Sequence, residues 1–419
     1  MHLNCSTQTE RPKCCIKGEA NNLPHKLIFK EIQEPLLSIY KNTNSLSIAC
    51  NTINNILSFG ATGVENSAGG AFEHDMLGPH AVKLNGRTYH LLHNANNNST
   101  DPSCGLSYFV FDNITALNSA SQSRQVDNTV VQAIFRYLTV YNPIARNLKA
   151  IGTEILHQDD RFLDRETPIL IARMNQQAQY LEVASITNSN ATGNKIIRFQ
   201  LKNKPNTTQI NMTSEILEPL CYPLLFTRGE DGWGDIYRKQ IKFPAYLASR
   251  MLKPDNIIMP TLHDNSRTIN VNRMQLLARL GQTYLVDMVS RAIDYKLKWN
   301  YNNQDNIFCG QHEMRYNRDE HVAEAVDDDE RSTFLPSSFH GSPRHLKELS
   351  NNALSIVSEL GPADLFITLT CNPNWNEIQE MLLPGQTAFD RPDIVCQVLD
   401  NKYYNCIYIT IYDLHRYIT

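Results

Sequence analysis

Residues 361–375 read Gly-Pro-Ala-Asp-Leu-Phe-Ile-Thr-Leu-Thr-Cys-Asn-Pro-Asn-Trp. The apolar and β-branched run from Leu365 to Thr370 has turn-forming residues on both sides, which is typical of a buried strand. A helical pattern precedes this run at about 344–360, and another follows from Asn374 to Leu383. Residues 391–400 also favour a helix, and the tyrosine- and isoleucine-rich run 403–412 favours a strand. The C-terminal part of the chain therefore predicts alternating helices and strands.

The middle of the chain is predicted to be helical. Over 271–299, apolar residues recur at steps of three and four, which predicts one long amphipathic helix whose apolar face packs in the core. A short helix is expected from Arg238 to Arg250.

The first half is predicted to be mixed and rich in strands. Helices are expected over 46–60, ending at Gly60, and over 129–151, with a break at Asn142-Pro143. Residues 60–70 are predicted to be a loop. Strands are expected over 81–84 and 87–92, around the hairpin signal Asn85-Gly86, and over 105–112, 180–186 and 195–201.

These patterns predict an α+β protein with four parts. The expected domains are a polar, cysteine-containing segment 1–60, a β-rich mixed domain 61–235, a helical region 236–340 and a partial αβ region 341–419. The length of 419 residues suffices for a sizeable core.

Composition excludes several classes of protein. Hydrophobic residues make up 42% and charged residues 20%, which excludes a largely disordered chain, and a net charge of −4 excludes a wholly basic, histone-like binder. We find no apolar run long enough to span a bilayer and no apolar signal segment at the N-terminus, so no membrane association and an intracellular location are expected. The ten scattered cysteines are expected to be free thiols.

Motifs for nucleotide or metal chemistry are missing. The sequence contains no P-loop, no Gly-x-Gly-x-x-Gly after a strand, no His-Glu-x-x-His, no Gly-x-Ser-x-Gly and no zinc-ribbon cysteine pairs. His90 and His93 stand on a predicted strand, where residues three apart point to opposite faces, and this argues against a shared metal ion.

The N-terminal cysteines are the one candidate metal site. Cys5, Cys14 and Cys15, with His2 and His25 nearby, supply thiolate and imidazole groups that suit zinc. Their spacing is not that of a standard Cys-x-x-Cys pair, so a reducible polar tail is the alternative.

A second candidate is a nucleic-acid interface in residues 228–300. This stretch has 12 Lys and Arg against 7 Asp and Glu, a local charge of +5 (12 − 7). Its basic residues alternate with aromatic ones, and the two together can hold a phosphate backbone and stack unpaired bases. The aromatic residues are Trp233, Tyr237, Phe243, Tyr246, Tyr284, Tyr295 and Trp299. The alternative is an ordinary helix surface above core aromatics.

Three ordered motifs closely resemble the helicase-like N-terminal region of Helitron transposon proteins. They are Leu335-Pro-Ser-Ser-Phe-His-Gly-Ser-Pro-Arg344, the segment 361–375 and Leu383-Pro-Gly-Gln-Thr-Ala-Phe-Asp-Arg-Pro-Asp393. Further upstream, Tyr222-Pro-Leu-Leu-Phe-Thr-Arg-Gly-Glu-Asp-Gly-Trp233 looks like another family segment, and Tyr141-Asn-Pro, Glu182-Val-Ala and Cys14-Cys15-x-Lys-Gly18 are similar to further landmarks. The resemblance covers about residues 14–400.

The resemblance implies a role in rolling-circle DNA transposition. Family members join a Rep nuclease of the HUH type to a helicase, and the full-length proteins use a divalent cation and ATP. Residues 366–370 resemble the first Rep motif, which implies an incomplete Rep-type, ferredoxin-like sheet at the C-terminus. Single-stranded DNA is the implied partner, and the implied location is nuclear if the chain acts in transposition.

The sequence departs from the family where catalysis would occur. No His-x-His pair follows Cys371, where His415 is the only later histidine, and none of the five tyrosines at 403, 404, 408, 412 and 417 stands in a catalytic context. No catalytic residue is therefore carried over. The chain is expected to be a truncated transposase segment that uses no cofactor and has neither nuclease nor helicase activity by itself.

The resemblance also implies residues that face nucleic acid. These are Thr368, Thr370 and Asn372, for which a purely structural strand is the alternative, and Arg344 and Arg391, which contact phosphate or cap nearby carbonyls. Two other hypotheses stay open for the whole chain: a domesticated remnant that acts as a protein-interaction module, and a decayed, poorly stable product with exposed sheet edges.

Overall fold

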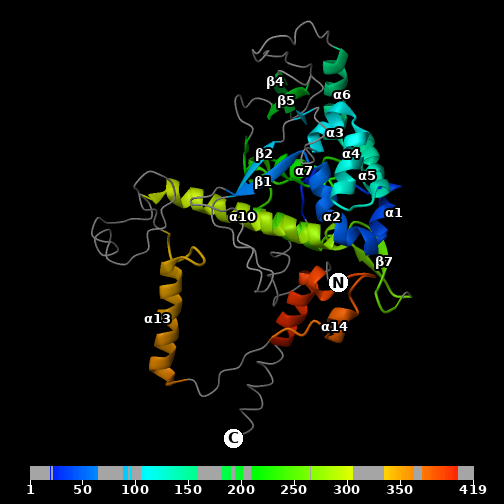
Figure 1. The fold of residues 1–419 in the computed structure, drawn as a ribbon. Helices are drawn as coiled ribbons and strands as arrows, with labels where there is room; N and C mark the ends of the chain where they lie inside the picture. The colour runs from blue at the N-terminus through cyan, green and yellow to red at the C-terminus, as the bar shows by residue number, and fades with distance from the viewer. Residues whose placement is uncertain are drawn as a thin grey trace. The chain divides into compact units, whose positions relative to one another are not determined.

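The computed structural model describes residue 19 and residues 22–64, 88–92, 95–96, 105–157, 181–189, 194–201, 209–264, 266–304, 335–362 and 370–403. The chain divides into two compact units (Figure 1). The first comprises Met1–Met288 together with Cys371–Thr419, and the second comprises Val289–Thr370. The four domains expected from the sequence stay a prediction.

Helices dominate the N-terminal part of the first unit. They are α1 (Leu36–Lys41), α2 (Thr43–Leu57), α3 (Gly105–Phe111), α4 (Ile114–Ser123), α5 (Asn128–Tyr141) and α6 (Pro143–His157). Figure 1 shows α3 to α6 gathered side by side, in agreement with their mutual contacts. The break that Asn142-Pro143 predicts is confirmed, because α5 ends and α6 begins there. Asp127 caps α5 by accepting a hydrogen bond from the backbone N–H of Thr129.

The strand predicted over 105–112 is wrong, because these residues form helix α3 and its end. Residues 106–110 are all buried, and Phe109 packs against Phe59 and Phe135 with ring centroids 5.2 and 4.6 Å apart. Packing of this run against α6 and other distant elements outweighs the strand preference of its aromatic and β-branched residues. The description of the first half as β-rich is therefore also wrong for 105–157.

Small antiparallel sheets accompany the helices. Strands β1 (Gly60–Val64), β2 (Thr88–Leu92) and β6 (Gln209–Ile210) form one sheet, in the order β1-β2-β6. Strands β3 (Ala95–Asn96), β5 (Asn194–Leu201) and β4 (Leu181–Ser189) form a second, in the order β3-β5-β4, and β4 and β5 confirm the two strands expected over 180–201. The loop predicted over 60–70 is wrong at 60–64, which pair with β2, and the hairpin partner at 81–84 lies outside the described residues.

The C-terminal elements of the first unit begin at α7 (Leu217–Cys221). Then follow η4 (Asp235–Tyr237), α8 (Phe243–Leu252), the hairpin β7 (Ile257–Pro260) and β8 (Thr268–Val271), α9 (Arg273–Leu276) and α10 (Ala278–Asn302). The helix predicted over 271–299 is found as two helices, α9 and α10. Its apolar face is buried as far as Met288, whereas Val289 and Ile293 are 52% and 45% exposed, so the prediction that the whole face packs in the core is wrong. Asn272 and Gln275 form a capping box that starts α9.

Residues 371–403 form a small cluster that packs beside β7 and α10. They contain α14 (Asn376–Gln379), η5 (Ala388–Asp390) and a helix over 392–403, which confirms the helix predicted over 391–400. Leu262 donates a backbone hydrogen bond to Leu382, and the side chain of Gln386 donates one to the carbonyl of Gln275. The predicted strands at 365–370 and 403–412 fall almost wholly outside the described residues, so the Rep-type sheet stays a prediction.

The second unit contains the end of α10 and helix α13 (Pro343–Leu360). Ser342 caps α13 by accepting a hydrogen bond from the backbone N–H of His345, and Gly361 ends it at a φ of 84°. The helix predicted over 344–360 is confirmed. Of the helices that the structure describes, none is both long enough and apolar enough to cross a membrane.

Candidate functional site

The segment 222–233 is a buried junction between distant parts of the chain. Its apolar residues 224–226 are fully buried in the main core. The carboxylate of Glu230 accepts hydrogen bonds from the backbone N–H groups of Arg228 and Lys30, both at 3.0 Å. The carboxylate of Asp231 accepts one from the hydroxyl of Tyr237. The acidic residues of this segment therefore stabilise the fold.

Arg273 is a completely buried cation in the same junction. Its Nε lies 2.9 Å from the carboxylate of Asp255, and its Nη1 lies 3.6 Å from that of Glu230. Its Nη1 and Nη2 also donate to the backbone carbonyls of Leu225 and Lys30, at 2.9 and 2.6 Å. A buried charge is tolerated only when it is paired and hydrogen-bonded, and Arg273 meets both conditions.

Glu218 is a buried acceptor for two tyrosines. Its Oε2 accepts hydrogen bonds from the hydroxyls of Tyr246 and Tyr284, and its Oε1 accepts one from the backbone N–H of Trp233 at 2.9 Å. Burial raises the pKa of Tyr246 and that of Tyr284 above the ordinary tyrosine value. Both hydroxyls therefore stay protonated and act as donors to Glu218.

His90 takes part in a third buried polar group. Its Nε2 lies 3.0 Å from both carboxylate oxygens of Asp287, and the hydroxyl of Tyr222 donates to Asp287 at 2.9 Å. His93 lies outside the described residues, so the pairing of the two histidines is not seen. In the part of the chain that the structure describes, no three His, Cys, Asp or Glu side chains gather as a metal site requires.

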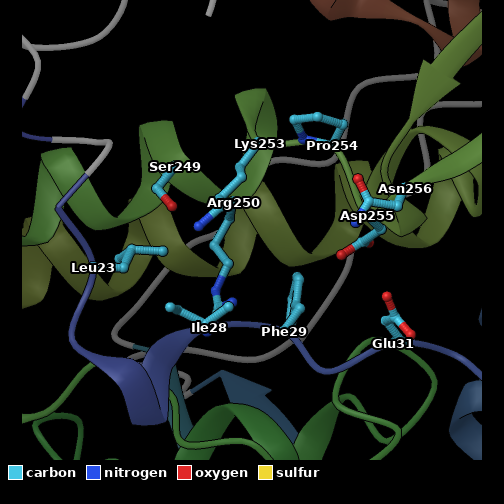
Figure 2. A pocket seen from close by; sticks show the side chains of 10 residues that line it. All are labelled: Leu23, Ile28, Phe29, Glu31, Ser249, Arg250, Lys253, Pro254, Asp255 and Asn256. Carbon is cyan, nitrogen blue, oxygen red and sulfur yellow. The ribbon is translucent and has the colours of Figure 1, made fainter.

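One pocket lies between the N-terminal segment and the end of α8 (Figure 2). Its volume is about 120 Å³. Figure 2 shows its two sides: one is formed by the segment 23–31, and the other by the last turn of α8 and the turn before β7. The residues that line it are Leu23, Ile28, Phe29, Glu31, Ser249, Arg250, Lys253, Pro254, Asp255 and Asn256.

Arg250 and Ser249 are the buried polar residues of this pocket, each 2% exposed. The Cζ of Arg250 lies 3.8 Å from the ring centroid of Phe29, and its Nη2 donates to the carbonyl of Asp231 at 3.2 Å. Nearby Tyr246, Tyr284 and Glu218 outweigh the opposing effect of burial and raise the pKa of Arg250, so it is charged. The Nε of Arg250 and the Oγ of Ser249 are buried without a hydrogen-bond partner.

Exposed basic side chains lie on the two segments that also supply the walls of the pocket, and we call them the basic rim. The two segments that carry them, 22–31 and 235–256, pack around one small core that includes Leu27, Tyr237 and Tyr246. The basic rim consists of Lys26, Lys30, Arg238, Lys239, Lys242 and Lys253. Within these segments the exposed carboxylates are Glu31 and Asp235, so positive charge predominates on this part of the surface.

The aromatic residues predicted to interleave with basic ones divide into two groups. Trp233, Tyr237, Tyr246 and Tyr284 are buried, and Phe243 is half-buried and packs against Trp233 at 5.0 Å between ring centroids. These five belong to the cores, as the alternative reading held. Tyr295 is half-buried and Trp299 is 50% exposed on α10.

The residues predicted to face nucleic acid occupy different environments. Thr370 and Asn372 are exposed, Arg344 is half-buried, and Thr368 lies outside the described residues. Arg391 is 3% exposed, and its Nε and Nη2 donate to the carboxylate of Asp393 at 2.9 and 2.8 Å. The partner of Arg391 is thus a carboxylate rather than a carbonyl. Thr370 and Arg344 belong to the second unit, and Asn372 and Arg391 to the first.

The zinc candidates Cys5, Cys14 and Cys15 lie outside the described residues. Sequence reasoning missed the pocket and the buried charges around it. The signal available in the sequence was an acidic pair, Glu230-Asp231, directly after an apolar run, since buried carboxylates require buried partners.

Comparison with known proteins identifies the C-terminal part of the chain. Residues 260–415 match the model of a family described as a Helitron helicase-like domain that stands at the N-terminus of its own proteins. No curated protein and no solved structure matches the chain. The match covers the motifs at 335–344, 361–375 and 383–393, whereas the segment 222–233 and the pocket precede it. Residues 260–415 are thus similar to the Helitron helicase-like N-terminal domain.

Proposed function

We propose that this chain binds single-stranded DNA in rolling-circle transposition, and that it neither nicks nor unwinds DNA by itself. The Helitron helicase-like match at residues 260–415 is the observation that carries the proposal. The proposal includes access to the nucleus, where a transposon's DNA lies. No catalytic residue and no cofactor is assigned to this chain.

The basic rim supports the choice of a nucleic-acid partner. Six exposed cations lie on two segments that share one small core, and they can neutralise several phosphates of one strand. The exposed Thr370 and Asn372 are proposed as further contacts, and Arg344 as a phosphate ligand. For Arg391, the ion pair with Asp393 must open before the side chain reaches a phosphate.

Fluorescence anisotropy with a labelled oligothymidylate tests this proposal. Since counterions are released on binding, log K should fall against log salt with a slope of about −0.7 per phosphate contacted on a single strand. The triple variant Lys239→Gln, Lys242→Gln, Lys253→Gln should reduce that slope by about two units. Lys41→Gln, an exposed lysine of α1 outside the basic rim, is the matched control and should leave the slope unchanged. Absence of binding at low salt, or an affinity independent of salt, would overturn the proposal.

A second candidate function is a protein-interaction module, which helix α13 favours. None of its residues is buried, and one face carries exposed apolar side chains. They are Leu346, Leu349, Leu354, Ile356, Val357 and Leu360. A protein that binds through this face should retain its partner when the basic rim is neutralised, and should lose it in the double variant Leu349→Glu, Ile356→Glu.

A further inference from the structure

We propose that the pocket between residues 23–31 and 249–256 holds one unpaired base of single-stranded DNA. The inference rests on the proposed function, because it names what part of the DNA the first unit binds. It adds a site outside the range 260–415 that the family match covers.

The size of the pocket restricts the ligand to a single chemical group. Pockets for whole cofactors or drug-sized ligands have volumes of about 300–1,000 Å³. At about 120 Å³, this pocket is too small for a complete nucleotide. One base, with its sugar and phosphate outside, is compatible with this space.

The walls of the pocket suit a flat, largely apolar group. Leu23, Ile28, Phe29 and Pro254 supply apolar surface from both sides (Figure 2). The guanidinium carbons of Arg250 and Arg273 lie 3.8 and 4.1 Å from the ring centroid of Phe29, so these cations cover the ring and fix it, and Phe29 offers the pocket its edge. Rigid apolar walls favour a ring that inserts without reorganising them.

The polar groups of the pocket suit the edge of a base. Asn256 lines the pocket, is exposed, and has both a donor and an acceptor in its side-chain amide. Base rings carry donors and acceptors along their edges, so this amide can form hydrogen bonds with one of them.

The charges of the pocket favour a neutral base over a phosphate group. Arg250 and Lys253 are cations, but Glu31 and Asp255 line the same pocket. An inserted phosphate would meet these two carboxylates, whereas a neutral ring would not. The surrounding basic rim provides cations for the phosphates on either side of the inserted base. The arrangement thus separates a base inside the pocket from a backbone outside it.

Comparison of two oligonucleotides of equal length and charge tests the inference on the full chain. One is oligothymidylate, and the other is the same strand with abasic sites in place of all bases. The wild-type chain should bind the first about fivefold or more tightly, because burial of one apolar ring in the pocket adds to the phosphate contacts. Both should show the same salt slope, because their phosphates are the same.

Two variants assign this preference to the pocket. Leu23→Trp fills the pocket from a half-buried position and should remove the preference while leaving the salt slope unchanged. Asn256→Gly removes a polar edge at a residue whose φ is 59°, which glycine adopts readily, and should weaken the preference. Val140→Trp places the same indole at a 57% exposed position of α5 and is the matched control. Thermal melting confirms that each variant is folded.

A second measurement separates failure of this inference from failure of the proposed function. Ligand-observed NMR with free thymidine or adenosine needs no backbone contacts. A nucleoside signal in the wild-type chain that Leu23→Trp abolishes supports the pocket even if no oligonucleotide binds, in which case the proposed function alone fails. Equal affinity for the two oligonucleotides, a preference that survives Leu23→Trp, or absence of a nucleoside signal would overturn the inference.

Discussion

Replacing Arg273 with methionine should destabilise the first unit by about 3–5 kcal/mol, the cost of breaking a buried charge pair by removing one partner. Arg273 is 0% exposed, and methionine retains much of its apolar volume but none of its donors. The carboxylates of Asp255 and Glu230, now 2.9 and 3.6 Å from the guanidinium, would stay buried without a cation. The carbonyls of Leu225 and Lys30 would also lose their donors.

Urea unfolding followed by tryptophan fluorescence measures this loss, because the indole of Trp233 is buried. Arg267→Met is the matched control, since Arg267 pairs with Glu380 at 3.3 Å but both side chains are about half exposed. The control should cost about 0–1 kcal/mol. Adding Asp255→Asn to Arg273→Met should recover about 0.5–3 kcal/mol, the usual range for coupled residues. Equal losses for Arg273→Met and Arg267→Met would refute the argument that burial gives this pair its weight.

Three further substitutions test separate contacts. Asp127→Ala should lower the free energy of unfolding by about 1 kcal/mol by removing the N-cap of α5, and Asp127→Asn should lower it by less, because asparagine keeps the cap but not the charge. Hydrogen bonds from the hydroxyl and N–H of Thr129 lower the pKa of Asp127, so its charge-dependent stabilisation is complete above the unfolded-state pKa. That stabilisation is lost as the pH falls through the lower folded-state pKa, and a pH series of the wild type against Asp127→Asn should show the difference. Tyr246→Phe should cost about 1–3 kcal/mol in urea unfolding, because it removes a donor to a buried carboxylate; a loss no larger than that of an exposed tyrosine would contradict this. Gly229→Ala should cost about 1–2 kcal/mol, since the φ of Gly229 is 60°, and an unchanged melting temperature would contradict it.

Patterns local in sequence predicted much of the secondary structure. The Asn142-Pro143 break, the strands at 180–201 and the helices at 271–299 and 344–360 each depend on residues within a few positions of one another. The strand predicted at 105–112 was wrong because contacts distant in the sequence decide its structure. Its aromatic and β-branched residues favour a strand, whereas packing of the wholly buried run 106–110 against other elements selects the helix.

The pocket could not be predicted, because its two sides come from distant parts of the sequence. The contact between Lys30 and Glu230 spans 200 residues, and that between Lys30 and Arg273 spans 243. No periodicity or local motif encodes such pairings. The sequence alone also left the role of the aromatic residues in 228–300 open, since a buried and an exposed tyrosine have the same spacing.

The buried charges and the proposed base pocket depend on each other through one short segment. The backbone N–H of Lys30 donates a hydrogen bond to Glu230, and the backbone carbonyl of Lys30 accepts one from Arg273. Both polar groups of the backbone next to Phe29 are therefore fixed. Arg250 and Arg273 then hold the ring of Phe29. The N-terminal side of the pocket is therefore positioned by residues that also stabilise the core. On the proposal above, the segment 222–233 contributes to base binding through Glu230, which fixes the backbone beside this wall of the pocket.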